Sequence, residues 1–222
     1  MPDGIGAPRC FAHVLGEAPD LDAVVRGLGE KYEIARNTYK AYPCGVVIHP
    51  VIDGCVDIAS TENVDPKKVA GVEIRGNPFL LELTGRKAPK TTLEGKLSVF
   101  HAAAAALIAR RVGEQEFADA FIQRDDVVAL REKVRVQPDP AIREDEAHVT
   151  VTLDDRRTLS RHVEHAAGTA ERPMTDREIE TKFRGLCEPY LPASRIDALI
   201  ERCWNVTALE NAAALVQLAA VE

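Results

Sequence analysis

The sequence predicts an α+β fold, with a mixed central region between helical ends. At residues 147–166, Val149, Val151 and Leu153 alternate with polar residues before the charged turn "DDRR". This pattern is typical of a β-hairpin with one buried face. After Pro173, apolar residues recur at helical spacing instead. The two patterns together place strands in the middle of the chain and helices at its end.

The elements before the hairpin follow from local signals. Residues 1–19 are rich in glycine and proline and predict a loop, and Asp20 fits the N-cap of a short helix behind it. We expect a second helix over "HPVIDGCVDIAS" and a strand over "VAGVEIRG", where apolar and polar residues alternate. The stretch "NPFLLELTG" is a short apolar segment or a further turn of helix.

A long central helix is expected next. Thr91 and Glu94 have the spacing of a capping box, and the helix that they open should run through "LEGKLSVFHAAAAALIARR". Short helices follow over "EFADAFIQ" and "DDVVALREKV", and "RVQPDP" then interrupts the regular pattern.

Three helices should end the chain. Thr175 and Glu178 form another capping box, "ASRIDALIERCW" predicts the second helix, and the third should run from Thr207 to near Ala220. The mixed region therefore spans roughly residues 36–170, between helical ends at 1–35 and 171–222.

Composition excludes several classes of protein. The 222 residues carry a formal charge of -7, which argues against a broad nucleic-acid interface. No apolar run is long enough for a membrane span and no signal-peptide pattern is present, so we expect a cytoplasmic protein. Five cysteines without C-x-x-C spacing argue against a disulfide framework, a structural zinc or an iron–sulfur cluster. We accordingly expect no metal and no other cofactor.

One short stretch, "TYKAYPCGVVIHP" at residues 38–50, concentrates groups that bind or move protons. The ammonium of Lys40 suits a carboxylate or phosphate, His49 can transfer protons near neutral pH, and Tyr42 lies between them. Pro43 favours an element boundary here. From spacing alone, however, a solvated Lys40 and a His49 that merely precedes a helix are the better interpretation.

A second group lies on the expected long helix. Glu94, Ser98 and His101 would share one face through i+4 and i+3 steps, whereas Lys96 would point elsewhere. The hydroxyl and imidazole could meet a polar ligand. Spacing alone again favours structural roles, in which Ser98 bonds to its own helix and His101 to a neighbouring element.

Other catalytic patterns are absent. The chain contains no G-x-S-x-G, no H-E-x-x-H and no glycine-rich phosphate loop. His162 and His165 could bind a metal if they were helical, but on a strand they would face opposite sides. His148 raises the same question, and we expect all three to be surface residues.

Two stretches carry a family resemblance: "NTYKAYPCGVVIHPVIDG" and "GRKAPKTTLEGKLSVFHAAAAALI" closely resemble signature stretches of the MmgE/PrpD family. The run "MTDREIETKFRGLCEPYLPASRIDALIERCW" resembles the family's closing helices. The family includes 2-methylcitrate dehydratase, which acts in propionate catabolism, and cis-aconitate decarboxylase.

The resemblance implies an α+β lid domain at residues 36–170. Residues 1–35 and 171–222 would then belong to the family's all-helical domain. Because family members are longer, the chain resembles only their C-terminal half. We expect a fragment, a split-gene product or a remnant that needs a separate N-terminal helical half, and little or no turnover from this chain alone. A homodimer is implied too.

The resemblance also assigns candidate site residues. Lys40 falls where the family has a substrate-side lysine, and His49 matches a motif histidine. His101 stands where several members have a tyrosine, and Gly45 where the decarboxylases carry a histidine. The implied catalytic residues are Lys40, His49 and His101, with Tyr42, Lys96 and Ser98 as substrate-binding residues.

The implied reaction is the metal-independent dehydration of a 2-methylcitrate-like tricarboxylic acid. Lys40 would hold a carboxylate, while His49 or His101 would act as base or acid or would orient the substrate. The alternatives are a decarboxylase or isomerase on the same scaffold, and a binding or dimerisation remnant without catalysis. We expect a small polycarboxylate as substrate and neither nucleic acid nor membrane as partner.

Overall fold

The computed structural model describes residues 7, 11–32, 34 and 37–221. The chain divides into two compact units, residues 1–37 and 38–222, and each is described by itself. In the described part of the first unit lie α1 (Phe11–Leu15) and α2 (Leu21–Val25). Asp20 caps α2 as expected, since its carboxylate accepts hydrogen bonds from the amides of Asp22 and Ala23.

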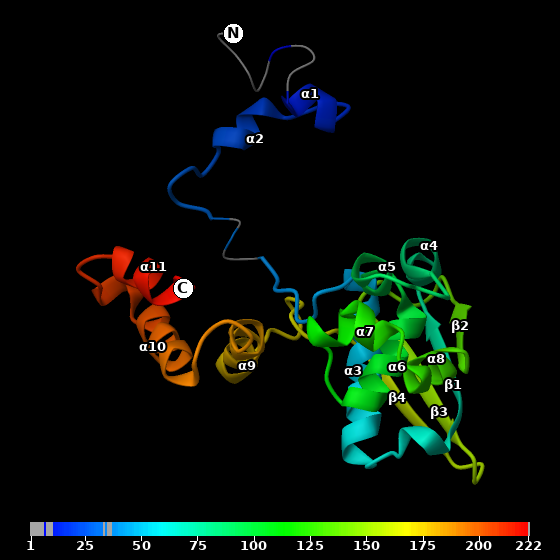
Figure 1. The fold of residues 1–222 in the computed structure, drawn as a ribbon. Helices are drawn as coiled ribbons and strands as arrows, with labels where there is room; N and C mark the ends of the chain where they lie inside the picture. The colour runs from blue at the N-terminus through cyan, green and yellow to red at the C-terminus, as the bar shows by residue number, and fades with distance from the viewer. Residues whose placement is uncertain (1–6, 8–10, 33, 35–36, 222) are drawn as a thin grey trace. The chain divides into compact units, whose positions relative to one another are not determined.

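The second unit contains a four-stranded sheet in the order β2-β1-β3-β4. Its strands are β1 (Val69–Gly76), β2 (Val134–Pro138), β3 (Ala147–Leu153) and β4 (Thr158–Val163). The pairing of β1 with β2 is parallel, and the other two pairings are antiparallel. This mixed sheet, with helices around it, confirms the α+β prediction (Figure 1).

One face of the sheet packs against helices. Ala147, Val149, Val151 and Leu153 of β3 are buried, whereas the residues between them are partly exposed. Two helices, α3 (His49–Thr61) and α6 (Val99–Ala109), lie beside this sheet (Figure 1). The alternation seen in the sequence therefore separates a core face from an open face.

The helix α3 approaches the sheet closely at Gly54. A Cβ atom added there would lie 2.9 Å from Cγ2 of Val149, which leaves no room for a side chain. The neighbouring α6 is alanine-rich, and every residue from Val99 to Leu107 is buried. A helix that is apolar on all sides needs cover on all sides, and small alanines let α3 and α6 pack closely.

The predicted long helix is wrong, because it is two helices. The first, α5 (Thr92–Lys96), ends before Leu97, and α6 begins after Ser98. The Oγ atom of Ser98 accepts a hydrogen bond from the amide of His101 at 3.1 Å, so Ser98 is an N-cap with extended backbone. Glu94, Ser98 and His101 consequently share no helical face.

Two further local predictions need correction. The stretch "RVQPDP", read as a break, contains most of β2, which pairs with β1 alone. The last helix does not start at Thr207: a 3₁₀ turn spans Val206–Ala208, and α11 runs over Ala213–Ala219. The remaining short helices are α4 (Phe79–Thr84), α7 (Asp119–Ile122) and α8 (Asp125–Arg131).

The other C-terminal helices match their predictions. The capping box of Thr175 and Glu178 opens α9 (Asp176–Cys187), and α10 spans Ala193–Trp204. A small apolar cluster of buried Leu191, Ile196 and Leu199 packs α10 against α9 and α11.

Within the described part of the chain, every helix is too short or too polar to traverse a bilayer. The domain boundaries at 36 and 170 and the cytoplasmic location stay predictions.

Candidate functional site

The loop at residues 38–48 leads directly into α3. Its backbone is fixed at two points, where the amide of Tyr39 bonds to the carbonyl of Gly168 and the amide of Gly45 to that of Lys96. Gly168 has a φ of 89°, and a Cβ atom there would lie 2.0 Å from the carbonyl oxygen of Tyr39. Only glycine fits this close approach. Loops from distant parts of the sequence therefore hold the segment in place.

Two lysines flank the buried turn at Cys44. Lys40, itself exposed, donates a hydrogen bond from Nζ to the carbonyl oxygen of Cys44 at 3.1 Å. Burial raises the pKa of Cys44 to about 12, although the charges of both Lys40 and Lys96 act in the opposite direction. Lys96 also forms an ion pair with Glu114 at 2.7 Å. The turn thus lies in a positive field while its thiol stays protonated.

The imidazole of His49 is buried beside this turn. Its side chain is 2% exposed, and Nε2 has no hydrogen-bond partner among the described residues. Burial and then the charge of Lys40 lower the pKa of His49 to about 4, against the backbone groups of Tyr42 and Cys44. The ring is therefore neutral near neutral pH, with one nitrogen unused by the protein.

Tyr42 is tied to the interior of α3. Its hydroxyl donates to Oδ1 of Asp53 at 2.5 Å, and its ring meets that of His49 edge-on, with centroids 5.3 Å apart. Burial, and then Asp53, raise the pKa of Tyr42, which keeps the phenol neutral. Tyr42 consequently positions the His49 ring while its own hydroxyl is already bonded.

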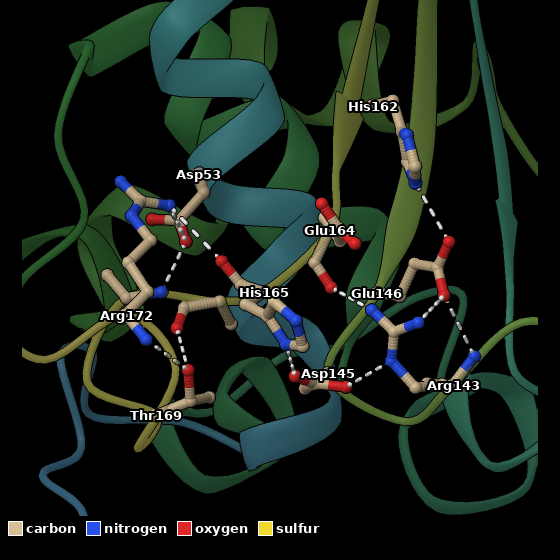
Figure 2. A network of polar contacts seen from close by, with 11 residues as sticks. Asp53, Arg143, Asp145, Glu146, His162, Glu164, His165, Thr169 and Arg172 are labelled. Atoms are coloured by element: carbon tan, nitrogen blue, oxygen red, sulfur yellow. Dashed lines mark hydrogen bonds and ion pairs between the residues drawn. The ribbon is translucent and has the colours of Figure 1, made fainter.

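Asp53 completes this network and was not singled out from the sequence. Its Oδ2 accepts hydrogen bonds from the amide of Ala167 at 2.8 Å and from Nη1 of Arg172 at 3.1 Å (Figure 2). The one available signal was its position four residues after His49, on the same face of a mostly apolar helix. Asp53 anchors residues 166–172 to the base of the site.

Ser98 and His101 occupy a separate, fully buried environment. Ser98 donates from Oγ to the carbonyl oxygen of Arg86 at 2.5 Å. Nε2 of His101 lies 2.8 Å from the carbonyl oxygen of Glu116, and its ring packs against Phe117 and Phe121. Burial lowers the pKa of His101 to about 4, and its Nδ1 has no partner among the described residues.

The structure thus brings four of the six candidates to one turn: Lys40, Tyr42, His49 and Lys96. No described contact joins His101 directly to Lys40 or His49. A cavity of about 430 Å³ adjoins Tyr42 and Pro43 and is also lined by residues 110–116 and by α9. It offers space for a small molecule, although neither Lys40 nor His49 lines it.

Two clusters of potential metal ligands lie near the β3–β4 hairpin. One consists of Glu146, His148 and His162, and the other of Asp145, His165 and Glu171. Figure 2 shows Glu146 with His162 and Asp145 with His165, each pair joined by a contact. From the sequence, metal binding by these histidines was considered for a helix, and surface positions were expected instead.

The fold defines an α+β domain that holds a neutral, buried imidazole next to lysines. Comparison with family models identifies it further, because the model described as the MmgE/PrpD C-terminal domain matches residues 42–206. The chain belongs to the MmgE/PrpD family. The comparison with curated proteins finds no match.

Proposed function

We propose that this chain forms the lid side of a hydro-lyase site for a 2-methylcitrate-like tricarboxylic acid. Support comes from its family membership and from the positive turn at residues 40–49. The matched region is a C-terminal domain, so the opposite wall of the cleft is expected on helical segments outside it. The proposal extends to a homodimer in the cytoplasm.

The observation that carries the proposal is the free Nε2 of His49 beside Lys40. Dehydration next to a carboxylate needs a cation for that carboxylate and a base for the adjacent proton. A neutral imidazole can accept the proton. Burial, and then the charge of Lys40, disfavour imidazolium in the free protein, and a bound substrate carboxylate would offset the charge of Lys40. Substrate binding would therefore make His49 a stronger base.

The other candidates have narrower roles in this proposal. Tyr42 orients His49, and Lys96 offers a second cation if a substrate carboxylate displaces Glu114. Ser98 fixes the start of α6, where His101 keeps Nδ1 available for proton transfer to a substrate that reaches it. These steps use side chains of the chain itself and need no metal.

One observation favours dehydration over decarboxylation. A Cβ atom at Gly45 would lie 2.9 Å from Cγ2 of Thr84, so the histidine that the resemblance implies for decarboxylases at this place would require Thr84 to shift. Two alternatives remain. Isomerisation of a related acid would be recognised by its product, and binding without catalysis by the absence of any product.

The test uses the purified chain with 2-methylcitrate, citrate and cis-aconitate. We expect tricarboxylates to perturb the NMR signals of His49 and Lys40, and little turnover without the helical half. After reconstitution with that half, the product should be the dehydrated acid. An unperturbed His49 signal at saturating tricarboxylate, or carbon dioxide as product, would contradict the proposal.

A further inference from the structure

The open face of the sheet carries a cross-strand pair of histidines. His148 of β3 and His162 of β4 are paired in register. Their neighbours face the other way, since Val149 is buried in the core and Arg161 forms an ion pair with Asp57 of α3. Side chains alternate along a strand, so both imidazoles lie on the face that α3 does not cover.

Three potential donor atoms converge on this face. The two rings are stacked, with centroids 4.1 Å apart and planes 5° from parallel. Oε1 of Glu146 lies 2.8 Å from Nε2 of His162 and 3.9 Å from Nε2 of His148. All three atoms lie within 4.8 Å of one another.

This spacing suits a metal ion of the zinc type. Ligand atoms about 2 Å from a tetrahedral ion lie roughly 3.3 Å from each other, and the two observed separations bracket that value. Binding would require that the parallel rings tilt and that the Nε2 proton of His162, now shared with Oε1 of Glu146, leaves the ring or is replaced by the Nδ1–H tautomer. Oε1 would then exchange this hydrogen bond for the ion. Two imidazoles and one carboxylate leave a fourth position for water.

The charges around the cluster are already balanced. Oε2 of Glu146 is held by Nη1 of Arg143 at 3.3 Å, whereas Oε1 is the oxygen that contacts His162 and faces the cluster. Arg143 is paired in addition with Asp145. Arg75, which faces His148 across β1 and β3, is bound to Asp139 at 2.7 Å. Each nearby guanidinium therefore has its own carboxylate, which reduces its repulsion of a cation.

We propose that Glu146, His148 and His162 form a binding site for a divalent transition-metal ion such as Zn²⁺, on the open face of the sheet. The site is independent of the proposed dehydratase chemistry and supplies no step to it. Its role is to bind an ion that joins β3, β4 and the residue that precedes β3.

Co²⁺ titration of the full purified chain, without a histidine tag, tests the site. We expect one equivalent to bind at this cluster with a visible spectrum of nitrogen and oxygen ligands, and Zn²⁺ to displace it. His148→Asn, His162→Asn and Glu146→Gln should each weaken binding by about 100-fold. His165→Asn, in the second cluster, is the matched control and should leave this affinity unchanged.

Three results would overturn the proposal. The first is unchanged Co²⁺ affinity in the His148→Asn/His162→Asn double variant. The second is loss of binding in His165→Asn alone, which would assign the ion to Asp145, His165 and Glu171. The third is a thiolate-to-cobalt charge-transfer band, which would assign it to a cysteine such as the exposed Cys203. Circular dichroism of each variant checks that the fold is retained, which we expect because all three side chains lie on the open face of the sheet, outside the core.

Discussion

The hydroxyl of Tyr42 donates a hydrogen bond to Asp53 across 2.5 Å, and this bond ties the loop before α3 to the interior of the same helix. Asp53 is buried and also holds Ala167 and Arg172. A single carboxylate thus joins three segments of the chain. The geometry around His49 therefore depends on Asp53, through Tyr42.

Asp53→Asn should destabilise the domain by about 1–3 kcal/mol, because the buried carboxylate accepts hydrogen bonds from Tyr42, Ala167 and Arg172 that an amide can satisfy only in part. Urea unfolding followed by circular dichroism measures this. Asp57→Asn is the matched control on the same helix: its ion pair with Arg161 is more exposed, and its loss should cost at most about 1 kcal/mol. Equal losses in the two variants would contradict the anchoring role.

Lys40→Ala should weaken tricarboxylate binding by roughly tenfold to a hundredfold, the effect of losing one charge-assisted hydrogen bond. In a reconstituted enzyme it should abolish activity while the fold stays intact, since Lys40 is exposed and contributes one bond to a backbone carbonyl. Isothermal titration calorimetry and turnover measure the two effects. Lys67→Ala, at an exposed lysine away from the turn, should change neither; unchanged turnover in Lys40→Ala would remove Lys40 from the mechanism.

Stability should fall as the solution is acidified. The folded-state pKa values of His49 and His101 are lowered to about 4, whereas an unfolded histidine titrates near 6.5. The unfolded state therefore binds more protons below about pH 6.5, and stability is lost as pH falls from there toward about 4. At about pH 5 the loss should be on the order of 2 kcal/mol per histidine.

Unfolding free energies measured between about pH 7 and about pH 5 check this dependence. His101→Gln should show a shallower slope than the parent over the same range, because one of the two buried imidazoles is gone. Histidine NMR signals give a direct readout: those of His49 and His101 should keep their neutral shifts at about pH 5.5. Protonation of both at that pH would refute the prediction.

Gly54→Ala should destabilise the domain by about 1–3 kcal/mol, although alanine favours helices, because the new methyl would collide with Val149 on the sheet. Gly185→Ala in α9 is the matched control. A Cβ atom there has nothing within 4 Å, so this change should strengthen its helix. Thermal unfolding compares the two variants, and a gain in stability from Gly54→Ala would mean that α3 can move away from the sheet.

Most helices and the hairpin could be predicted from the sequence, because their signals are local. The alternation of Val149, Val151 and Leu153 marked β3, and the capping box at Thr175 marked α9. The strand β2 was missed because it is five residues long, ends in Pro138 and is recognisable only through its pairing with β1. Ser98 was expected inside one long helix opened by Thr91, whereas the structure uses both Thr91 and Ser98 as N-caps, with a helix after each.

The site was less predictable because its contacts connect distant parts of the chain. Lys40, Tyr42 and His49 are close in sequence, and the structure places them on one turn. The role of Asp53 depends on Arg172, 119 positions away. Likewise, the pairing of His148 with His162 follows from the register of two strands, which spacing within either strand does not reveal.

The strand order has a consequence for how the protein is made. The strand β1 emerges early in synthesis, but both of its neighbours, β2 and β3, come more than fifty residues later. Until residues 134–138 have emerged from the ribosome, the apolar side chains of β1 have no partner strand, and the whole sheet needs the chain through Val163. This interval is when the nascent protein is most exposed to aggregation or to a chaperone.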